Sequence, residues 1–166
     1  MAPPFSNTGV GRYDGFQEAD LYMSYGFDFG LSVGLTDYYY QGSPFFKFSQ
    51  ENDDSAASHA FEINLGYEIG GLSLSGNYIL NNAANGAGSL GGDMYFELGY
   101  SFENFDIFLG AGDGWHTSTG DFAVCNVGIS TSSELKISDS FSIPVSGAVI
   151  VNPEKEEFNL VVGLSF

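Results

Sequence analysis

The chain has 166 residues, of which 43% are hydrophobic and 16% aromatic, a content too high for a disordered chain and sufficient for one domain. Its 21 acidic residues outnumber its 4 basic residues and give a net charge of −17, which argues against nucleic acid or an anionic lipid surface as a partner attracted by charge. The single cysteine excludes an internal disulfide, and the 23 glycines follow no collagen period, so they are expected to serve turns and close packing.

Apolar side chains occupy every second position along about nine consecutive segments, a pattern that predicts strands with one apolar face. The positions between them hold mainly glycine, serine, asparagine and carboxylates. In the seventh segment the apolar series is expected to begin at Cys125, which we interpret as a small apolar strand residue. In chain order, the predicted strands cover residues 21–29, 31–35, 61–69, 72–80, 94–102, 105–111, 125–137, 141–151 and 158–166.

The connections between these segments alternate strictly between short and long. Tight turns are predicted at Gly30, Gly70–Gly71, Glu103–Asn104 and Ser138–Ser140, and mostly longer polar loops near residues 41–57, 81–92, 113–121 and 152–156. An up-and-down antiparallel meander produces this alternation, and bacterial outer-membrane barrels have short periplasmic turns and longer extracellular loops. The sequence therefore predicts an all-β, transmembrane up-and-down antiparallel β-barrel with about nine or ten strands.

A soluble lipocalin-like barrel or a β-sandwich is the alternative fold, because its strands also alternate. In such folds the large apolar residues point inward, and the outer face is rich in Lys, Glu and Thr. Here the polar positions are mostly Gly, Ser and Asn, and Lys136 is the only base among them. This composition suits a confined, hydrated lumen and favours lipid around the apolar face.

Two sets of site residues follow from this fold. Unbalanced carboxylates in a narrow lumen attract cations, so we expect a narrow passive porin-like channel with weak cation selectivity, or a structural barrel. Aromatic residues near strand ends are expected to form girdles at the membrane interfaces. The expected lumen residues are Asp28, Glu62, Glu68, Glu97, Asp106, Glu134 and Lys136, and the expected girdle residues are Phe27, Phe29, Tyr100, Phe102, Trp115 and Phe166.

Histidines near the predicted loop rim raise a second hypothesis, an outer-membrane hydrolase. His59 and His116 both fall at this rim, with Asp113, Ser118 and Asp121 close to His116 in sequence. Such residues can serve as general base and nucleophile. Solvated loop residues are the simpler interpretation, and we predict no catalytic residue and no enzyme.

The predicted loops leave further alternatives open. In QGSPFFKFS, three phenylalanines, Phe45, Phe46 and Phe48, could form a constriction in the mouth, bind a ligand or enter the outer membrane interface. Trp115 could be an interface anchor or a platform for a sugar, so a soluble or surface ligand-binding barrel is a third hypothesis. The stretch SQENDDSAASH lacks the spacing of a known Ca²⁺ loop, and we predict no metal site and no cofactor.

Several segments resemble a known family. DLYMSYGFDFGLSVGLTDYYY, HAFEINLGYEIGGLSLSGNYIL and FAVCNVGISTSSELKISDSFSIPVSGAVIVNP followed by NLVVGLSF are similar to an uncharacterised family of outer-membrane β-barrels of the Bacteroides type, the TorF-like porins. The resemblance covers roughly residues 19–166. It implies an outer-membrane location, with the bilayer or detergent and small ions or solutes as partners, and it carries no catalytic motif.

The N-terminus departs from this family, whose barrels of about twelve strands have additional N-terminal strands. Residues 1–18 could supply one poor strand at most, because Pro3, Pro4 and several glycines interrupt it. MAPPFSNTGV also lacks the basic and apolar regions of a signal peptide, so an exported form would be mature, truncated or engineered. We expect a single domain over residues 1–166, closed by a tenth strand from residues 1 to about 10 or in some other way.

Overall fold

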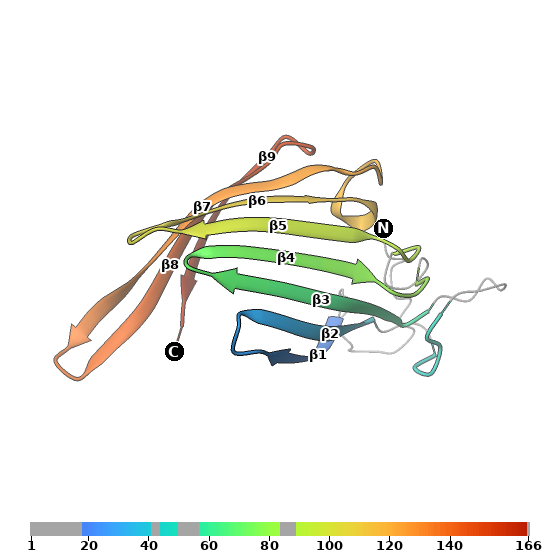
Figure 1. Cartoon of the computed structure of the whole chain (residues 1–166), viewed down its shortest axis with the longest axis horizontal. Helices are drawn as coiled ribbons and strands as arrows, with labels where there is room; N and C mark the ends of the chain where they lie inside the picture. The colour runs from blue at the N-terminus through green and yellow to red at the C-terminus, as the bar shows by residue number, and fades with distance from the viewer. Residues whose placement is uncertain (1–17, 41–43, 50–56, 84–88, 166) are drawn as a thin grey trace, which may run out of the picture. The chain divides into compact units, whose positions relative to one another are not determined.

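The computed structural model describes residues 18–40, 44–49, 57–83 and 89–165. These residues form nine strands in one antiparallel sheet, and the strand order along the sheet follows the order along the chain (Figure 1). The all-β class and the meander predicted from the sequence are therefore confirmed. The one helix in the described ranges is a three-residue 3₁₀ helix, η1, Gly114–His116.

The strand bounds agree with the alternating segments except at the first two strands. The second segment was expected to end at residue 35, but β2 continues to Tyr40. The first segment was expected to run to residue 29, but β1 ends at Gly26 and residues 27–30 form a turn, in which the Phe27 amide donates to Leu31 O at 2.7 Å. Gly30 has a φ of 96°, which few other residues adopt, and so it ends the strand geometry. The strands are β1 Glu18–Gly26, β2 Leu31–Tyr40, β3 His59–Ile69, β4 Leu72–Ile79, β5 Met94–Ser101, β6 Asp106–Gly112, β7 Ala123–Ser138, β8 Phe141–Asn152 and β9 Glu157–Leu164.

The chain divides into two compact units. The first unit comprises residues 1–65 and 77–94, and the second comprises residues 66–76 and 95–166. The division cuts through β3 and β4, which are neighbours in the strand order. The single domain expected over residues 1–166 stays a prediction.

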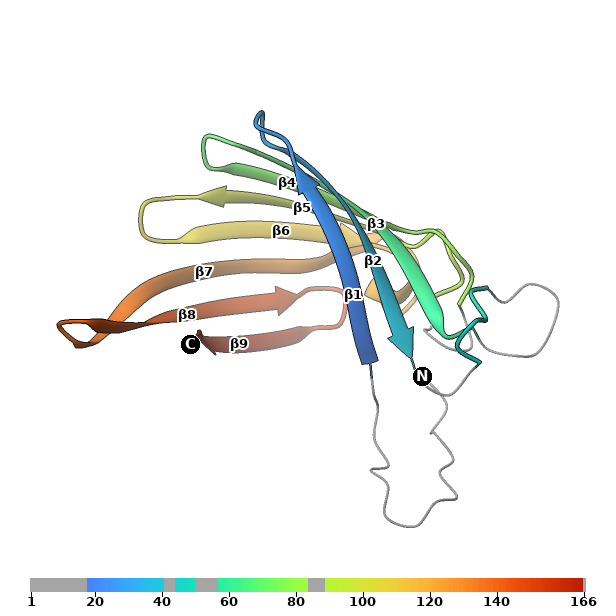
Figure 2. The ribbon, with the colours of Figure 1, turned by 90° about the horizontal axis from the view of Figure 1, so that it is seen from below.

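Short turns join the strands of the second unit at one end (Figure 2). Gly70 and Gly71 between β3 and β4 have φ values of 56° and 89°, which accounts for the choice of glycine in this two-residue hairpin turn. Residues 102–105 join β5 to β6, and residues 139–140 join β7 to β8. These turns and the turn at residues 27–30 of the first unit confirm the short connections predicted from the sequence.

The strand registers place apolar side chains on one face and polar side chains on the other. In the second unit Leu98 lies opposite Leu109, which lies opposite Val127. At the adjacent positions Glu97 lies opposite Gly110, which lies opposite Asn126. Because opposed residues in an antiparallel pair share a face, the alternation seen in the sequence becomes an apolar face and a polar face of the sheet.

The apolar face is exposed. Leu65, Leu98 and Val162 keep 48%, 45% and 71% of their surface accessible. The apolar residues that are buried in the described ranges are Ala57, Ala60, Ile79, Ala83 and Cys125. Most of them are small, so the described sheet does not enclose its large apolar side chains in a protein core.

A β-bulge changes the side-chain alternation in β7. Asn126 lies opposite Gly110, but Val124 lies opposite Ala111, so Cys125 is the extra residue. The expectation that the apolar series begins at Cys125 is corrected, because the bulge shifts the register by one residue and Val124 takes the place opposite Ala111. Cys125 is a buried residue of a strand with 7% of its surface exposed, as its interpretation as a small apolar strand residue requires.

Closure of the sheet into a barrel would require pairing between the two ends of the strand order. The order begins at β1 and ends at β9, and no ladder within the described ranges joins these two strands. Residues 1–17, which include the expected tenth strand, lie outside the described residues, as does Phe166. Closure into a barrel therefore stays a prediction.

Candidate functional site

The polar face of the first unit carries a hydrogen-bond network around Glu62. The Tyr38 hydroxyl donates to Glu62 Oε1 at 3.0 Å, and the Asn64 amide donates to the same oxygen at 2.5 Å. Asn64 also accepts a hydrogen bond from Thr36 at 2.8 Å and donates to Asn77 at 3.1 Å. Glu62 is 4% exposed, and this expected lumen residue is bound by Tyr38 of β2 and Asn64 of β3, while Asn77 of β4 joins the network through Asn64.

A second network surrounds Glu97 on the polar face of the second unit. The Tyr95 hydroxyl donates to Glu97 Oε2 at 2.6 Å, and the Asn126 amide donates to this oxygen at 3.0 Å and to the Tyr95 oxygen at 2.8 Å. A Cβ atom at Gly110 would lie 2.1 Å from the Tyr95 hydroxyl oxygen. The glycine therefore makes the space in which Tyr95 reaches Glu97.

Two more expected lumen residues have polar partners in the second unit. Asp106 Oδ2 accepts a hydrogen bond from the Ser130 hydroxyl at 3.4 Å. The Lys136 ammonium lies 2.9 Å from Asp139 Oδ1 in an exposed ion pair. Lys136 is thus paired within its own hairpin, and such an exposed pair contributes little to stability.

The remaining expected lumen residues are exposed. Asp28 lies in the turn after β1, Glu68 lies near the end of β3, and Glu134 lies in the second half of β7. The structure therefore places Glu62 and Glu97 in separate hydrogen-bond networks, one in each unit, rather than in a single cluster of carboxylates.

Aromatic side chains gather at the short-turn ends of both units. In the first unit Phe27 lies between Tyr25 and Phe29, with ring centroids 4.9 and 5.4 Å apart. In the second unit the Phe102 ring lies 4.8 Å from that of Tyr100 and stacks on Phe105 at 4.7 Å. These four expected girdle residues, Phe27, Phe29, Tyr100 and Phe102, are all exposed. Phe166 is a girdle prediction that lies outside the described residues.

His59, in the first unit, is buried, although the simpler interpretation of the sequence was a solvated loop residue. His59 is 2% exposed, and its Nδ1 lies 2.8 and 2.9 Å from the two carboxylate oxygens of Asp37. Its Nε2 lies 2.7 Å from the Phe45 carbonyl oxygen, which only accepts hydrogen bonds, so Nε2 donates. Both ring nitrogens of His59 thus have polar partners in this arrangement.

Four aromatic rings surround the His59 imidazole. The Phe61 ring is nearly parallel to it, at 5.7 Å and 5°, and the rings of Tyr39, Phe45 and Phe48 lie 5.0 to 5.1 Å away. The sequence pattern did not reveal this cluster. One signal was available in the sequence: Asp37 and His59 both stand at apolar-face positions of their strands, where a polar or charged side chain needs a polar partner.

His116, in the second unit, contacts the aromatic side chains of Trp115 and Tyr95. The Trp115 indole N–H donates to His116 Nε2 at 2.8 Å, and the His116 ring lies 5.1 Å from that of Tyr95. Trp115 therefore lies close to the polar-face network of Glu97, and its place in a girdle stays a prediction. Ser118, the nucleophile considered beside His116, donates from its hydroxyl to Glu154.

Glu154 joins two of the long connections in the second unit. Its carboxylate oxygens accept from the Ser118 amide at 3.0 and 3.1 Å and from the Ser118 hydroxyl. These hydrogen bonds lower the pKa of Glu154, because they favour the charged carboxylate. The contact holds the connection after β6 to the connection after β8.

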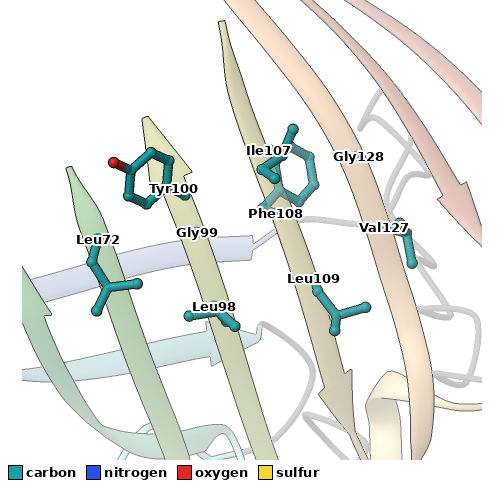
Figure 3. A pocket seen from close by; sticks show the side chains of 9 residues that line it. All are labelled: Leu72, Leu98, Gly99, Tyr100, Ile107, Phe108, Leu109, Val127 and Gly128. Carbon is teal, nitrogen blue, oxygen red and sulfur yellow. The ribbon is translucent and has the colours of Figure 1, made fainter. Parts of the chain in front are cut away.

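The apolar face of the second unit is hollowed by a pocket of about 390 Å³ (Figure 3). Gly99 and Gly128 form part of its lining, and Phe108 stands between them in the register. A Cβ atom at Gly128 would lie 2.1 Å from the Phe108 ring, so this ring lies against the glycine. Phe108 is a large apolar residue at a polar-face position, and the alternating pattern of the sequence did not indicate its role here. The other lining residues are Leu72, Leu98, Tyr100, Ile107, Leu109 and Val127.

The described ranges contain no group of three or more His, Cys, Asp or Glu side chains that could hold a metal ion. In the same ranges, no helix has the length and apolar character required to cross a membrane. No family model, curated protein or solved structure matches the chain.

Proposed function

We propose that the protein is an outer-membrane β-barrel that acts as a narrow, weakly cation-selective passive channel. One observation carries the proposal: the apolar face of the sheet is exposed, whereas the polar face is hydrogen bonded. Leaving the exposed surface of large side chains such as Leu98 and Val162 in water forgoes part of the roughly 1.5–3 kcal/mol that full burial of each would contribute. A bilayer around that face removes this loss.

The polar face supports the second part of the proposal. Glycine, serine and asparagine line it, and Glu62 and Glu97 contribute carboxylates. In a narrow hydrated passage such carboxylates attract cations and repel anions. Asp106 and the exposed Asp28, Glu68 and Glu134 add negative charge, and Lys136 is balanced by Asp139.

A spanning sheet requires that both of its edges be paired, because unpaired backbone groups cannot face hydrocarbon. The proposal therefore includes a partner for the edges of β1 and β9, for which residues 1 to about 10 are the candidate as a tenth strand. Membership in the TorF-like family also belongs to the proposal, and the sequence resemblance over roughly residues 19–166 supports it.

The test is to refold the protein in detergent, reconstitute it into planar bilayers and record conductance. We expect small, stable, cation-favouring current steps, together with compact migration on a gel that is lost on heating. A protein that is monodisperse in water without detergent would contradict the membrane proposal. Insertion without conductance would contradict the channel and leave a structural barrel.

A further inference from the structure

We infer that residues 44–48 form a lipid-interface anchor, held on the apolar face of the first unit by the Asp37–His59 pair. The inference rests on the proposed membrane location and names the partner of this segment: the boundary between lipid headgroups and acyl chains. It also decides between the alternatives for Phe45, Phe46 and Phe48, because it places them outside the mouth.

The segment is fastened to the sheet by polar contacts. His59 Nε2 donates to Phe45 O at 2.7 Å, and the Ser58 amide and hydroxyl donate to Lys47 O at 3.1 Å and Pro44 O at 3.0 Å. Asn81 donates to Phe48 O at 2.5 Å. The backbone is thus fixed at four carbonyl groups, by His59 of β3, by Ser58 just before β3 and by Asn81 just after β4.

The fastened side of the segment faces the apolar surface. Phe45 and Phe48 lie beside His59, and Phe48 also lies 6.0 Å from Phe61. Phe61 belongs to the apolar series that continues along β3 through Leu65. Residues 44–48 therefore extend the exposed apolar face at the long-loop end of β2 and β3.

The outer side of the segment has the composition of an interface anchor. Phe46 is 81% exposed, and Phe45 and Phe48 are also exposed. Aromatic rings favour the headgroup level of a bilayer, and these three stand together at the long-loop end of β2 and β3.

The Asp37–His59 pair explains how a carboxylate is tolerated on this face. Asp37 stands at an apolar-face position, where a lone charge would be costly near lipid. Its two oxygens are bound by His59, and His59 is enclosed by aromatic rings. Asp37 and His59 are positioning residues, since they act on the anchor through the Phe45 carbonyl.

Tryptophan fluorescence in reconstituted vesicles tests the inference. In a Trp115→Phe background, Phe46→Trp is compared with Leu65→Trp in phosphatidylcholine vesicles that carry a quencher at a shallow or a deep acyl position. We expect the Phe46→Trp reporter to lose more emission to the shallow quencher and the Leu65→Trp reporter to lose more to the deep one. If the lipid-attached quenchers act on Leu65→Trp alone, the anchor is refuted and the membrane proposal stands. If they act on neither reporter, the anchor and the membrane proposal both fail.

The positioning role is tested in the same vesicles with Asp37→Asn and His59→Gln. Each variant should shift the Phe46→Trp emission to longer wavelength and reduce its shallow quenching, while the Leu65→Trp reporter stays unchanged. Asp139→Asn, which removes a carboxylate paired with Lys136 in the second unit, is the matched control and should leave both reporters unchanged. Unaltered Phe46→Trp quenching in both variants would refute the positioning role. Quenching that depends on protein concentration would indicate that a second copy of the chain, and not lipid, covers residues 44–48, and would refute the anchor.

Discussion

At the scale of single residues, glycines and large side chains are matched on the polar face. The Phe108 ring lies against Gly128, and the Tyr95 hydroxyl lies over Gly110. In each case a Cβ atom would lie within 3.0 Å of several side-chain atoms, and for Phe108 these belong to a rigid ring. The glycines of the strands therefore serve close packing as well as turns, as the composition suggested.

Gly128→Ala should lower the free energy of unfolding by about 1–3 kcal/mol, because the added methyl group displaces the Phe108 ring. Urea unfolding of protein refolded into vesicles measures the change. Gly147→Ala is the control, since its Cβ would meet its nearest atom at 3.9 Å. The double variant Gly128→Ala, Phe108→Ala should cost less than the sum of the two single changes, and simple additivity would contradict the proposed packing.

Ser118→Ala should raise the pKa of Glu154 toward that of an ordinary carboxylate, because it removes the hydroxyl hydrogen bond that favours the charged form. A depressed pKa means that the Ser118–Glu154 contact is fully present above the ordinary carboxylate pKa and is lost as the pH falls through the lowered value. NMR titration of the Glu154 carboxylate measures this shift. Ser132→Ala in β7 is the control, and an equal shift there would contradict the assignment.

At the scale of elements, the alternating pattern predicted all nine strands and the short turns, because side-chain period and turn residues are local properties. Features that depend on a neighbouring strand could not be predicted in this way. The bulge at Cys125 appears only when β7 is paired with β6. Likewise, Asp37 and His59 are far apart in sequence, and nothing local indicates that residues 44–48 cover their pair.

The candidate site also has features that the local sequence predicts and features that depend on neighbouring strands. The sequence placed Glu62 and Glu97 at polar positions, because alternation determines the face of a side chain. It could not predict that Tyr38 and Asn64 bind Glu62, or that Tyr95 and Asn126 bind Glu97, since these contacts cross strands. The partner of a carboxylate is a property of the register and not of the local pattern.

Adjacent residues of β7 test which face meets lipid. Ile129 lies opposite Ile107 on the apolar face, whereas Ser130 contacts Asp106 on the polar face. If Ile129 lies near the bilayer midplane, Ile129→Arg should cost about 2–4 kcal/mol of folding free energy in lipid. Ser130→Arg should cost clearly less, because Asp106 offers its side chain a counter-charge. Equal costs, measured by urea unfolding in vesicles, would refute the lipid-facing assignment.

At the scale of the whole molecule, the proposed membrane location requires a partner for the free edges of β1 and β9 in the described sheet. Deleting residues 158–166 removes the paired strand β9 and exposes the edge of β8, so compact, heat-sensitive gel migration should be lost. Deleting residues 1–10 should have a similar effect if they form the closing strand. A deletion of residues 1–10 that folds and inserts normally would show that closure uses another segment or another chain.

Charge selectivity is the property of the whole molecule that most directly tests the proposed channel. The chain carries a net charge of −17, and the Glu97 carboxylate is kept on the polar face by Tyr95 and Asn126. Fixed carboxylates in a narrow passage favour cations, and salt screens them over about 10 Å at 0.1 M. The reversal potential across a KCl gradient should therefore show weak cation selectivity that declines as the salt concentration rises.

Glu97→Gln should reduce this selectivity, because it removes the charge while keeping an oxygen that can accept from Tyr95 and Asn126. Glu103→Gln, in the exposed turn between β5 and β6, is the matched control and should change the reversal potential less. The two variants should fold alike, so that a difference between them reports the passage and not the stability of the sheet. An anion-selective current, or an equal response to both substitutions, would overturn the assignment of the Glu97 face as the lining of the channel.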